Sequence, residues 1–229
     1  MKTRLVFLAA ISLVSAGCVS HITQTREPEE TIYDTRWGAE INAFKQRDAN
    51  HPVPDNGILF VGSSSIRMWE TGRFFPESNV LNRGFGGSDI KAVNYFFDTI
   101  VSCYNPSIIV LYAGDNDIAA GLSPEEVFED FQDFYGLCSD TLPAAEIIYL
   151  SIKPSGSRID FWPDMQKANA LIEQFCQTKS NLQYLDLASC LLGDDDKPND
   201  DFFIDDRLHL NEAGYCLWTA KLKPLLVVQ

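Results

Sequence analysis

The sequence is poor in basic residues. Its 229 residues include 18 lysines and arginines against 32 aspartates and glutamates, which gives a formal net charge of −14. A nucleic-acid-binding surface needs an excess of basic side chains to neutralise phosphates. Broad electrostatic adhesion to anionic lipid needs the same excess. The charge balance therefore argues against both kinds of partner.

Histidine is scarce as well, and metal-binding motifs are missing. The three histidines and six cysteines form no Cys-x-x-Cys pair and no Cys/His cluster, so the sequence offers no zinc ligand set. The acidic run 194–196, with Asp200 and Asp201, has the ligand chemistry of calcium, but it is more typical of a solvated loop. We expect neither a metal nor an organic cofactor.

The apolar run at the N-terminus is too short to cross a bilayer. Residues 1–17 contain Lys2 and Arg4, then the apolar run Leu5–Val14, then small residues. This arrangement is typical of a secretory signal peptide. Its removal takes away two positive charges and no negative ones, so the formal charge would change from −14 to −16.

Cys18 directly follows this segment. Small residues that end in cysteine resemble the processing site of bacterial lipoproteins, in which the cysteine is lipidated. Ser15 stands where such sites usually carry leucine, so ordinary cleavage to a soluble periplasmic or secreted protein is the alternative. We expect an outer-membrane lipoprotein that faces the periplasm and contacts the membrane only through Cys18. The polar residues 18–36 would be its tether.

Five further cysteines remain for the mature domain. An oxidising compartment permits disulfides, but an odd number leaves at least one thiol unpaired unless another chain supplies a partner. We expect most of these side chains to be buried as small apolar groups. They are Cys103, Cys138, Cys176, Cys190 and Cys216.

Short apolar segments alternate with helical patterns along the rest of the chain. This alternation predicts βαβ units, and therefore a parallel sheet with helices on both faces. Right-handed crossovers favour a flavodoxin-like three-layer α/β/α sandwich with strand order 2-1-3-4-5. The five strands are expected at 57–61, 80–82, 107–113, 146–152 and 182–187.

Helices are predicted from the spacing of apolar residues and from their caps. Ser123, Pro124 and Glu126 form the pattern of a capping box with proline at the first helical position. Asn211 is placed to cap the last helix. The predicted helices span 37–44, 90–100, 123–138, 163–178 and 211–222.

The segment Gly57–Trp69 stands out because a buried strand ends in Gly62 and three serines, and then becomes helical. Such a turn presents a hydroxyl at the carboxyl edge of the sheet, where open α/β sheets bind ligands. The alternative is an ordinary strand-to-helix turn in which a serine caps the helix.

A base for such a hydroxyl is present near the C-terminus. Asp206 precedes His209 by three residues, so its carboxylate can accept a hydrogen bond from Nδ1 and leave Nε2 free to take a proton. His21 falls in the tether, and His51 precedes the first strand, at the expected amino edge. The alternative role for His209 is structural hydrogen bonding.

Two residues are candidates to stabilise an oxyanion. Gly87 follows the second strand and, without a Cβ, can bring its N–H close to a substrate. Asn116 follows the third strand and offers a side-chain amide. The alternatives are a helix-entry turn at Gly86–Gly87 and an Asx turn at Asp115–Asn116. All these segments follow strands, so we expect them to meet at one edge of the sheet.

Together, these segments resemble the SGNH hydrolases, also called GDSL-like esterases and lipases. The resemblance extends from Gly57 to Trp218 and keeps the family's order of sequence blocks. The matching blocks are Gly62–Ser65, Asn82–Gly87, Gly114–Asp117 and Asp206–His209.

The resemblance implies a serine acylhydrolase domain over residues 37–229. It assigns Ser64 as nucleophile, with His209 and Asp206 as its catalytic partners. It assigns the oxyanion hole to the N–H groups of Ser64 and Gly87 and the side chain of Asn116.

One position departs from the family pattern. Ser63 stands where the family usually has aspartate, so the contacts of that carboxylate must be missing or replaced. Ser64 is preferred as nucleophile because it is the second residue after Gly62.

The expected function is hydrolysis of a small-acyl ester, such as an acetyl ester of a carbohydrate or envelope component, because no lid-sized insertion follows the strands. Lysophospholipase or thioesterase activity is the alternative within the family. A non-catalytic, membrane-tethered binding module is the alternative outside it. Arg67, Arg83 and Lys153 could contact a polar or anionic substrate, but we expect them to be solvated.

Overall fold

The computed structural model describes residues 29–51, 53 and 55–226. The expected signal peptide 1–17, the expected lipidation site Cys18 and the tether as far as residue 28 lie outside the described residues. Within the described ranges, none of the helices has the length and apolar character needed to cross a bilayer.

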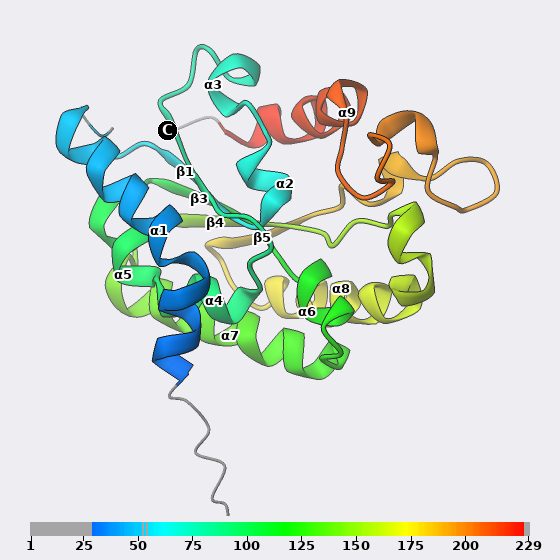
Figure 1. The fold of residues 1–229 in the computed structure, drawn as a ribbon, viewed down its shortest axis with the longest axis horizontal. Coiled ribbons are helices and arrows are strands. Elements are labelled where there is room, and N and C mark those ends of the chain that lie inside the picture. Colours follow the sequence, from blue (N-terminus) through cyan, green and yellow to red (C-terminus); the bar gives the residue numbers. More distant parts are fainter. Residues whose placement is uncertain (1–28, 52, 54, 227–229) are drawn as a thin grey trace, which may run out of the picture.

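A five-stranded parallel sheet lies at the centre of the molecule (Figure 1). Its strand order is β2-β1-β3-β4-β5, which confirms the predicted order and the predicted α/β/α class. The strands are β1 (Ile58–Gly62), β2 (Val80–Gly84), β3 (Ile108–Tyr112), β4 (Glu146–Leu150) and β5 (Leu182–Leu185).

Alternation of side chains along each strand creates two separate cores. Leu59 and Val61 of β1 point into one cluster, while Ile58 and Phe60 point into the other. The larger cluster is covered by α1 (Glu29–Asn50), α4 (Ile90–Tyr95), α5 (Phe97–Ile100), α7 (Pro124–Thr141) and α8 (Trp162–Cys176). The smaller is covered by α2 (Ser64–Arg67), α3 (Thr71–Phe74) and α9 (Glu212–Leu222).

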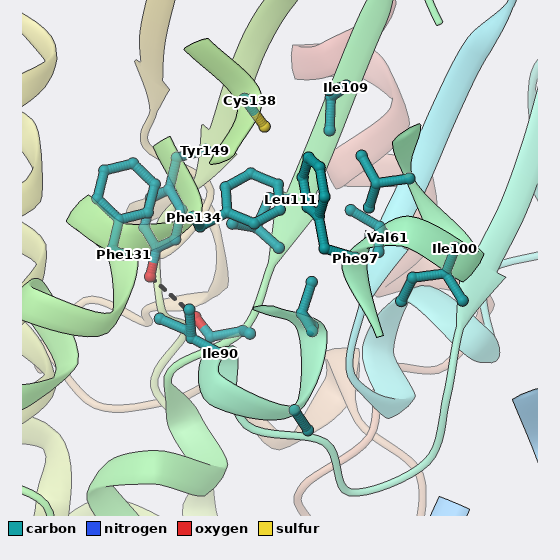
Figure 2. Packing of buried hydrophobic residues seen from close by; sticks show 14 of the residues in the cluster. Val61, Ile90, Phe97, Ile100, Ile109, Leu111, Phe131, Phe134, Cys138 and Tyr149 are labelled. Atoms are coloured by element: carbon teal, nitrogen blue, oxygen red, sulfur yellow. Dashed lines mark hydrogen bonds between the residues drawn. The ribbon is translucent and has the colours of Figure 1, made fainter. Parts of the chain in front are cut away.

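The larger core supports the loop that follows β3. In Figure 2, aromatic rings of α7 pack beside Tyr149 of β4, and the Phe131 and Tyr149 ring centroids lie 4.8 Å apart. The Tyr149 hydroxyl donates a hydrogen bond to the Ala113 carbonyl at 2.8 Å, drawn dashed in the figure. The core therefore fixes the backbone just before the short helix α6 (Asp115–Ala119).

The first helix is longer than the sequence predicted. Tyr33, Trp37, Ile41 and Phe44 are buried on one face of α1, and their spacing of four, four and three residues is the spacing of an amphipathic helix. The helix therefore begins within residues 18–36, for which we expected a polar tether.

A buried ion pair ties the C-terminal part of α1 to the sheet. Arg83 of β2 is 1% exposed and pairs with Asp48 of α1. Its Nε donates to the Tyr104 hydroxyl at 2.7 Å, and that hydroxyl donates to Asp48 Oδ2 at 2.6 Å. The expectation that Arg83 is a solvated surface residue is wrong, because its side chain is buried. The sequence did not reveal this, since Asp48 and Tyr104 lie far from Arg83 along the chain.

The cap predictions hold, whereas the cysteine prediction holds only in part. Ser123 and Glu126 form the capping box of α7, and Asn211 caps α9. All five cysteines of the described part are free thiols. Cys138 and Cys176 alone among them are buried, while Cys103 and Cys216 are exposed, so most are not buried apolar groups.

Candidate active site

The turn after β1 admits only glycine at its first position. Gly62 has φ +134°, and a Cβ there would lie 1.9 Å from the Tyr112 carbonyl oxygen. The next N–H, that of Ser63, donates to the same oxygen at 2.9 Å. The chain therefore turns into α2 tightly against β3 and places Ser64 at the carboxyl edge of the sheet.

The structure distinguishes the three serines of this turn. Ser63 is fully buried and Ser65 is 1% exposed, and neither hydroxyl has a hydrogen-bond partner among the described residues. The Ser64 Oγ lies 2.9 Å from the His209 Nε2. Ser64 is therefore the serine of this turn that contacts an imidazole.

His209 and Asp206 belong to one closed turn between η4 (Asp200–Phe202) and α9. The Asp206 Oδ2 lies 2.5 Å from the His209 Nδ1. The other carboxylate oxygen accepts the backbone N–H groups of Leu208 at 2.8 Å and His209 at 2.9 Å. The Ile204 N–H donates to the His209 carbonyl at 2.9 Å, which closes the turn at its base.

The electrostatics of this turn fix the histidine tautomer. Burial raises the pKa of Asp206, but the hydrogen bonds from the His209 ring and from the two backbone N–H groups outweigh it and lower the pKa to about 2. Asp206 is therefore ionised at neutral pH and can only accept, so Nδ1 carries the proton. Nε2 is left as an acceptor for the Ser64 hydroxyl.

Gly87 lies in the loop after β2, and Asn116 lies in α6 after β3. The two segments flank Ser64, because Gly62 pairs with Gly84 on one side and with Tyr112 on the other. The Asn116 Nδ2 donates to the Ser88 carbonyl at 2.9 Å, which leaves its second amide hydrogen available. Gly87 has φ +69°. Over the described part of the chain, no hydrogen bond joins either candidate donor directly to Ser64.

An unforeseen charged cluster orients the Asn116 amide. Arg158 donates to the Asn116 Oδ1 at 2.8 Å and to the Asp115 Oδ2 at 2.9 Å. Lys153, 1% exposed, lies 3.6 Å from the same Asp115 oxygen, and burial lowers the pKa of this lysine. Lys153 is therefore not the solvated surface residue that we expected. Arg158 lies in the 3-10 helix η2 (Gly156–Phe161) and matches no sequence motif, so no signal in the sequence identified it.

Asp117 of α6 connects the segment after β3 to the start of α4. Its Oδ1 accepts the Ile90 N–H at 2.9 Å, and its Oδ2 has no partner among the residues that the structure describes. Burial raises the pKa of Asp117 to about 8, although the hydrogen bond from Ile90 opposes the shift. The carboxyl group is therefore largely protonated at neutral pH.

This protonation predicts a pH dependence of stability. Between pH 4 and pH 8 the folded protein keeps a proton on Asp117 that the unfolded chain loses, so the free energy of unfolding falls as pH rises, by at most about 1.4 kcal/mol per pH unit. Asp117→Asn keeps the acceptor and does not titrate, so it should flatten this slope in urea unfolding. Asp133→Asn, at an exposed aspartate of α7, should keep the slope. An unchanged slope in Asp117→Asn would contradict the prediction.

Among the residues that the structure describes, no three His, Cys, Asp or Glu side chains form a group that could hold a metal ion. In the acidic loop, Asp200 accepts from Arg207 at 2.9 Å, and Asp195 pairs with Lys197 at 3.6 Å. The nearby acids are therefore partly neutralised by basic neighbours.

A parallel three-layer sandwich with serine, histidine and aspartate in hydrogen-bonded series at its carboxyl edge has the arrangement found in serine hydrolases. The sequence comparison is more specific: the GDSL-like Lipase/Acylhydrolase family matches residues 69–217. The chain belongs to this family. The matched span includes Gly87, Asn116, Asp206 and His209 but begins after Ser64.

Solved structures of similar fold cover most of the chain. A candidate platelet activating factor from Streptococcus pneumonia is 20% identical with a TM-score of 0.75, over 86% of this chain and 96% of that one. A GDSL-like lipase from Bacteroides thetaiotaomicron is 19% identical with a TM-score of 0.70, over 82% and 97%. A variant of an acetyl-xylooligosaccharide esterase from Geobacillus Stearmophilus is 13% identical with a TM-score of 0.61, over 78% and 98%. At these identities the likeness establishes the fold. No curated protein sequence matches the chain.

Proposed function

We propose that this protein is a serine esterase that hydrolyses small-acyl carboxylic esters through an acyl-enzyme. The observation that carries the proposal is the 2.9 Å contact between the Ser64 Oγ and the His209 Nε2. Membership of an acylhydrolase family supports the reaction class.

In the proposed mechanism, His209 takes the proton of Ser64 as the serine oxygen attacks the ester carbonyl carbon. Asp206 stabilises the imidazolium that forms. The N–H groups of Ser64 and Gly87 and the Asn116 amide donate to the developing oxyanion. His209 then protonates the leaving alcohol, and a water molecule repeats the attack on the acyl-enzyme with His209 as base.

The short connections after β1 and β3 support a small acyl group. Helix α2 begins two residues after β1 ends, and α6 begins three residues after β3 ends. Neither connection leaves room for a lid that could enclose a long acyl chain. The acetyl-xylooligosaccharide esterase of similar fold is consistent with an acetyl ester of a carbohydrate. The proposed export would place such a substrate in the cell envelope.

A chain-length series tests this proposal. We expect the purified protein to hydrolyse p-nitrophenyl acetate with a kcat/KM at least about tenfold above that for the decanoate, because the short connections after β1 and β3 offer little surface to bury a longer chain. A fluorophosphonate probe should label Ser64, located by mass spectrometry.

Two results would change the proposal. A preference for long acyl chains or thioesters would favour the lysophospholipase or thioesterase alternative. Absence of both hydrolysis and labelling would favour a non-catalytic binding module.

A further inference from the structure

Three side chains from α1 bind one short piece of backbone at the candidate oxyanion hole. The Trp37 Nε1 donates to the Gly86 carbonyl at 2.9 Å. The Glu40 Oε2 accepts the Gly86 N–H at 3.2 Å. The Arg36 Nη2 donates to the Gly87 carbonyl at 3.3 Å. One turn of a helix that precedes the sheet in the chain therefore contacts three of the four polar groups of the Gly86–Gly87 backbone.

The same backbone is enclosed from the side of the nucleophile. A Cβ on Gly86 would lie 2.9 Å from the Arg67 guanidinium carbon, and Arg67 ends the helix that begins at Ser64. The Arg67 Nη1 in turn lies 3.9 Å from the Glu40 Oε1. Arg67 is thus half exposed but packed on this loop, and the loop lies between α1 and α2.

Peptide geometry gives the Trp37 contact a direct consequence. The Gly86 carbonyl and the Gly87 N–H belong to the same planar trans peptide unit, so they point in opposite directions. A donor that holds the carbonyl on the α1 side therefore directs the N–H to the other side. Two glycines in succession place few steric limits on the rotation of this unit, so the orientation has to come from its partners.

Trp37 is well suited to hold this peptide unit. Its indole is 3% exposed and packs edge-on against Phe85, with ring centroids 5.7 Å apart. The Arg36 guanidinium carbon lies 4.3 Å from the centroid of the indole ring. The ring is therefore fixed by packing on both sides, and its N–H is held towards the Gly86 carbonyl.

We propose that Trp37 is a positioning residue, which fixes the Gly86–Gly87 peptide so that the Gly87 N–H is available to the substrate oxyanion. The inference rests on the proposed esterase function. It makes α1 a necessary support of the active site. A rotated peptide would instead present a carbonyl oxygen to the developing negative charge and would oppose the reaction.

The test is Trp37→Phe in the full-length chain, since phenylalanine keeps an aromatic ring but lacks the N–H. We expect kcat for p-nitrophenyl acetate to fall about tenfold with KM nearly unchanged, because the lost orientation matters most in the transition state. Trp218→Phe is the matched control. Trp218 is fully buried, and its Nε1 has no partner in the described part of the chain. The control should lose stability in urea without a loss of kcat.

Glu40 provides a conservative rescue. Glu40→Gln keeps an oxygen that can accept the Gly86 N–H and should retain most of kcat, whereas Glu40→Ala should lose it. Hydrogen exchange of the amides of residues 86–88 is a readout that needs no activity, and it should become faster in Trp37→Phe but not in Trp218→Phe.

The outcomes separate this inference from the proposed function. If the unmodified protein hydrolyses no ester, the proposed function fails, and hydrogen exchange alone still tests the support by α1. Unchanged kcat and unchanged exchange in Trp37→Phe would overturn the inference. An equal fall of kcat in Trp37→Phe and Trp218→Phe would also overturn it, because it would indicate general destabilisation.

Discussion

Replacing Ser64 by alanine is expected to lower kcat for p-nitrophenyl acetate by about 10³-fold or more. The variant loses the only hydroxyl of its turn that contacts His209. His209→Ala should cause a similar loss. The double variant should be no worse than either single one, because a nucleophile and its base act as a unit. Steady-state kinetics at saturating substrate measure all three.

The neighbouring serines are built-in controls. Ser63→Ala and Ser65→Ala each remove a buried hydroxyl with no partner in the described structure. Such a change costs little stability, because no hydrogen bond is broken. Both variants should keep kcat within about twofold of the unmodified protein. A loss of activity in Ser63→Ala or Ser65→Ala comparable to that in Ser64→Ala would contradict the assignment of the nucleophile.

Asn116→Ala is expected to lower kcat by about 100- to 1000-fold, or roughly 3 kcal/mol. The variant removes the side-chain amide whose second hydrogen is proposed to reach the oxyanion. KM should change little, because the ground-state carbonyl carries less charge than the transition state. A change confined to KM would instead assign Asn116 to substrate binding.

Asn116→Asp is the companion variant. The carboxylate keeps an acceptor for Arg158, which donates to this side chain at 2.8 Å, but it loses the hydrogen bond to the Ser88 carbonyl. It replaces the N–H donor by a negative charge, and kcat should fall at least as far as in Asn116→Ala. Asn94→Ala, which removes a hydrogen bond to the Asp130 carbonyl on the α4–α7 face, should leave kcat unchanged. High activity in Asn116→Asp would exclude the proposed donor role.

The sheet could be predicted from the sequence because its strands are specified by residues that are close together in the chain. Strands β1, β3 and β4 contain short apolar runs, as in Ile108–Tyr112, and helical segments separate the strands. Right-handed crossovers then leave few possible orders. The start of α1 was missed, although Tyr33 continues the spacing of Trp37 and Ile41 and is buried in the structure. Most residues around Tyr33 are polar, so the apolar pattern is weakest in this first part of the helix.

The candidate site likewise has a part that local sequence patterns predict and a part that they do not. The Asp206–His209 spacing and the serines after Gly62 are local motifs, and the structure brings Ser64 and His209 into contact. The orientation of these groups depends on partners distant in sequence. Trp37 lies 49 residues before the Gly86 carbonyl that it binds, and Arg158 lies 42 residues after Asn116. Neither pairing has a spacing that sequence patterns could reveal.

The short turn that carries both Asp206 and His209 has a consequence for how the protein fluctuates. Its internal hydrogen bonds make the carboxylate and the imidazole one preassembled body, whereas Ser64 is attached to a different part of the sheet. A thermal fluctuation that opens the site would therefore move Asp206 and His209 together away from Ser64, and the hydrogen bond between the carboxylate and the imidazole would stay intact. The distance between the Ser64 Oγ and the His209 Nε2 would then distinguish molecules in which the proton can be transferred from molecules in which it cannot.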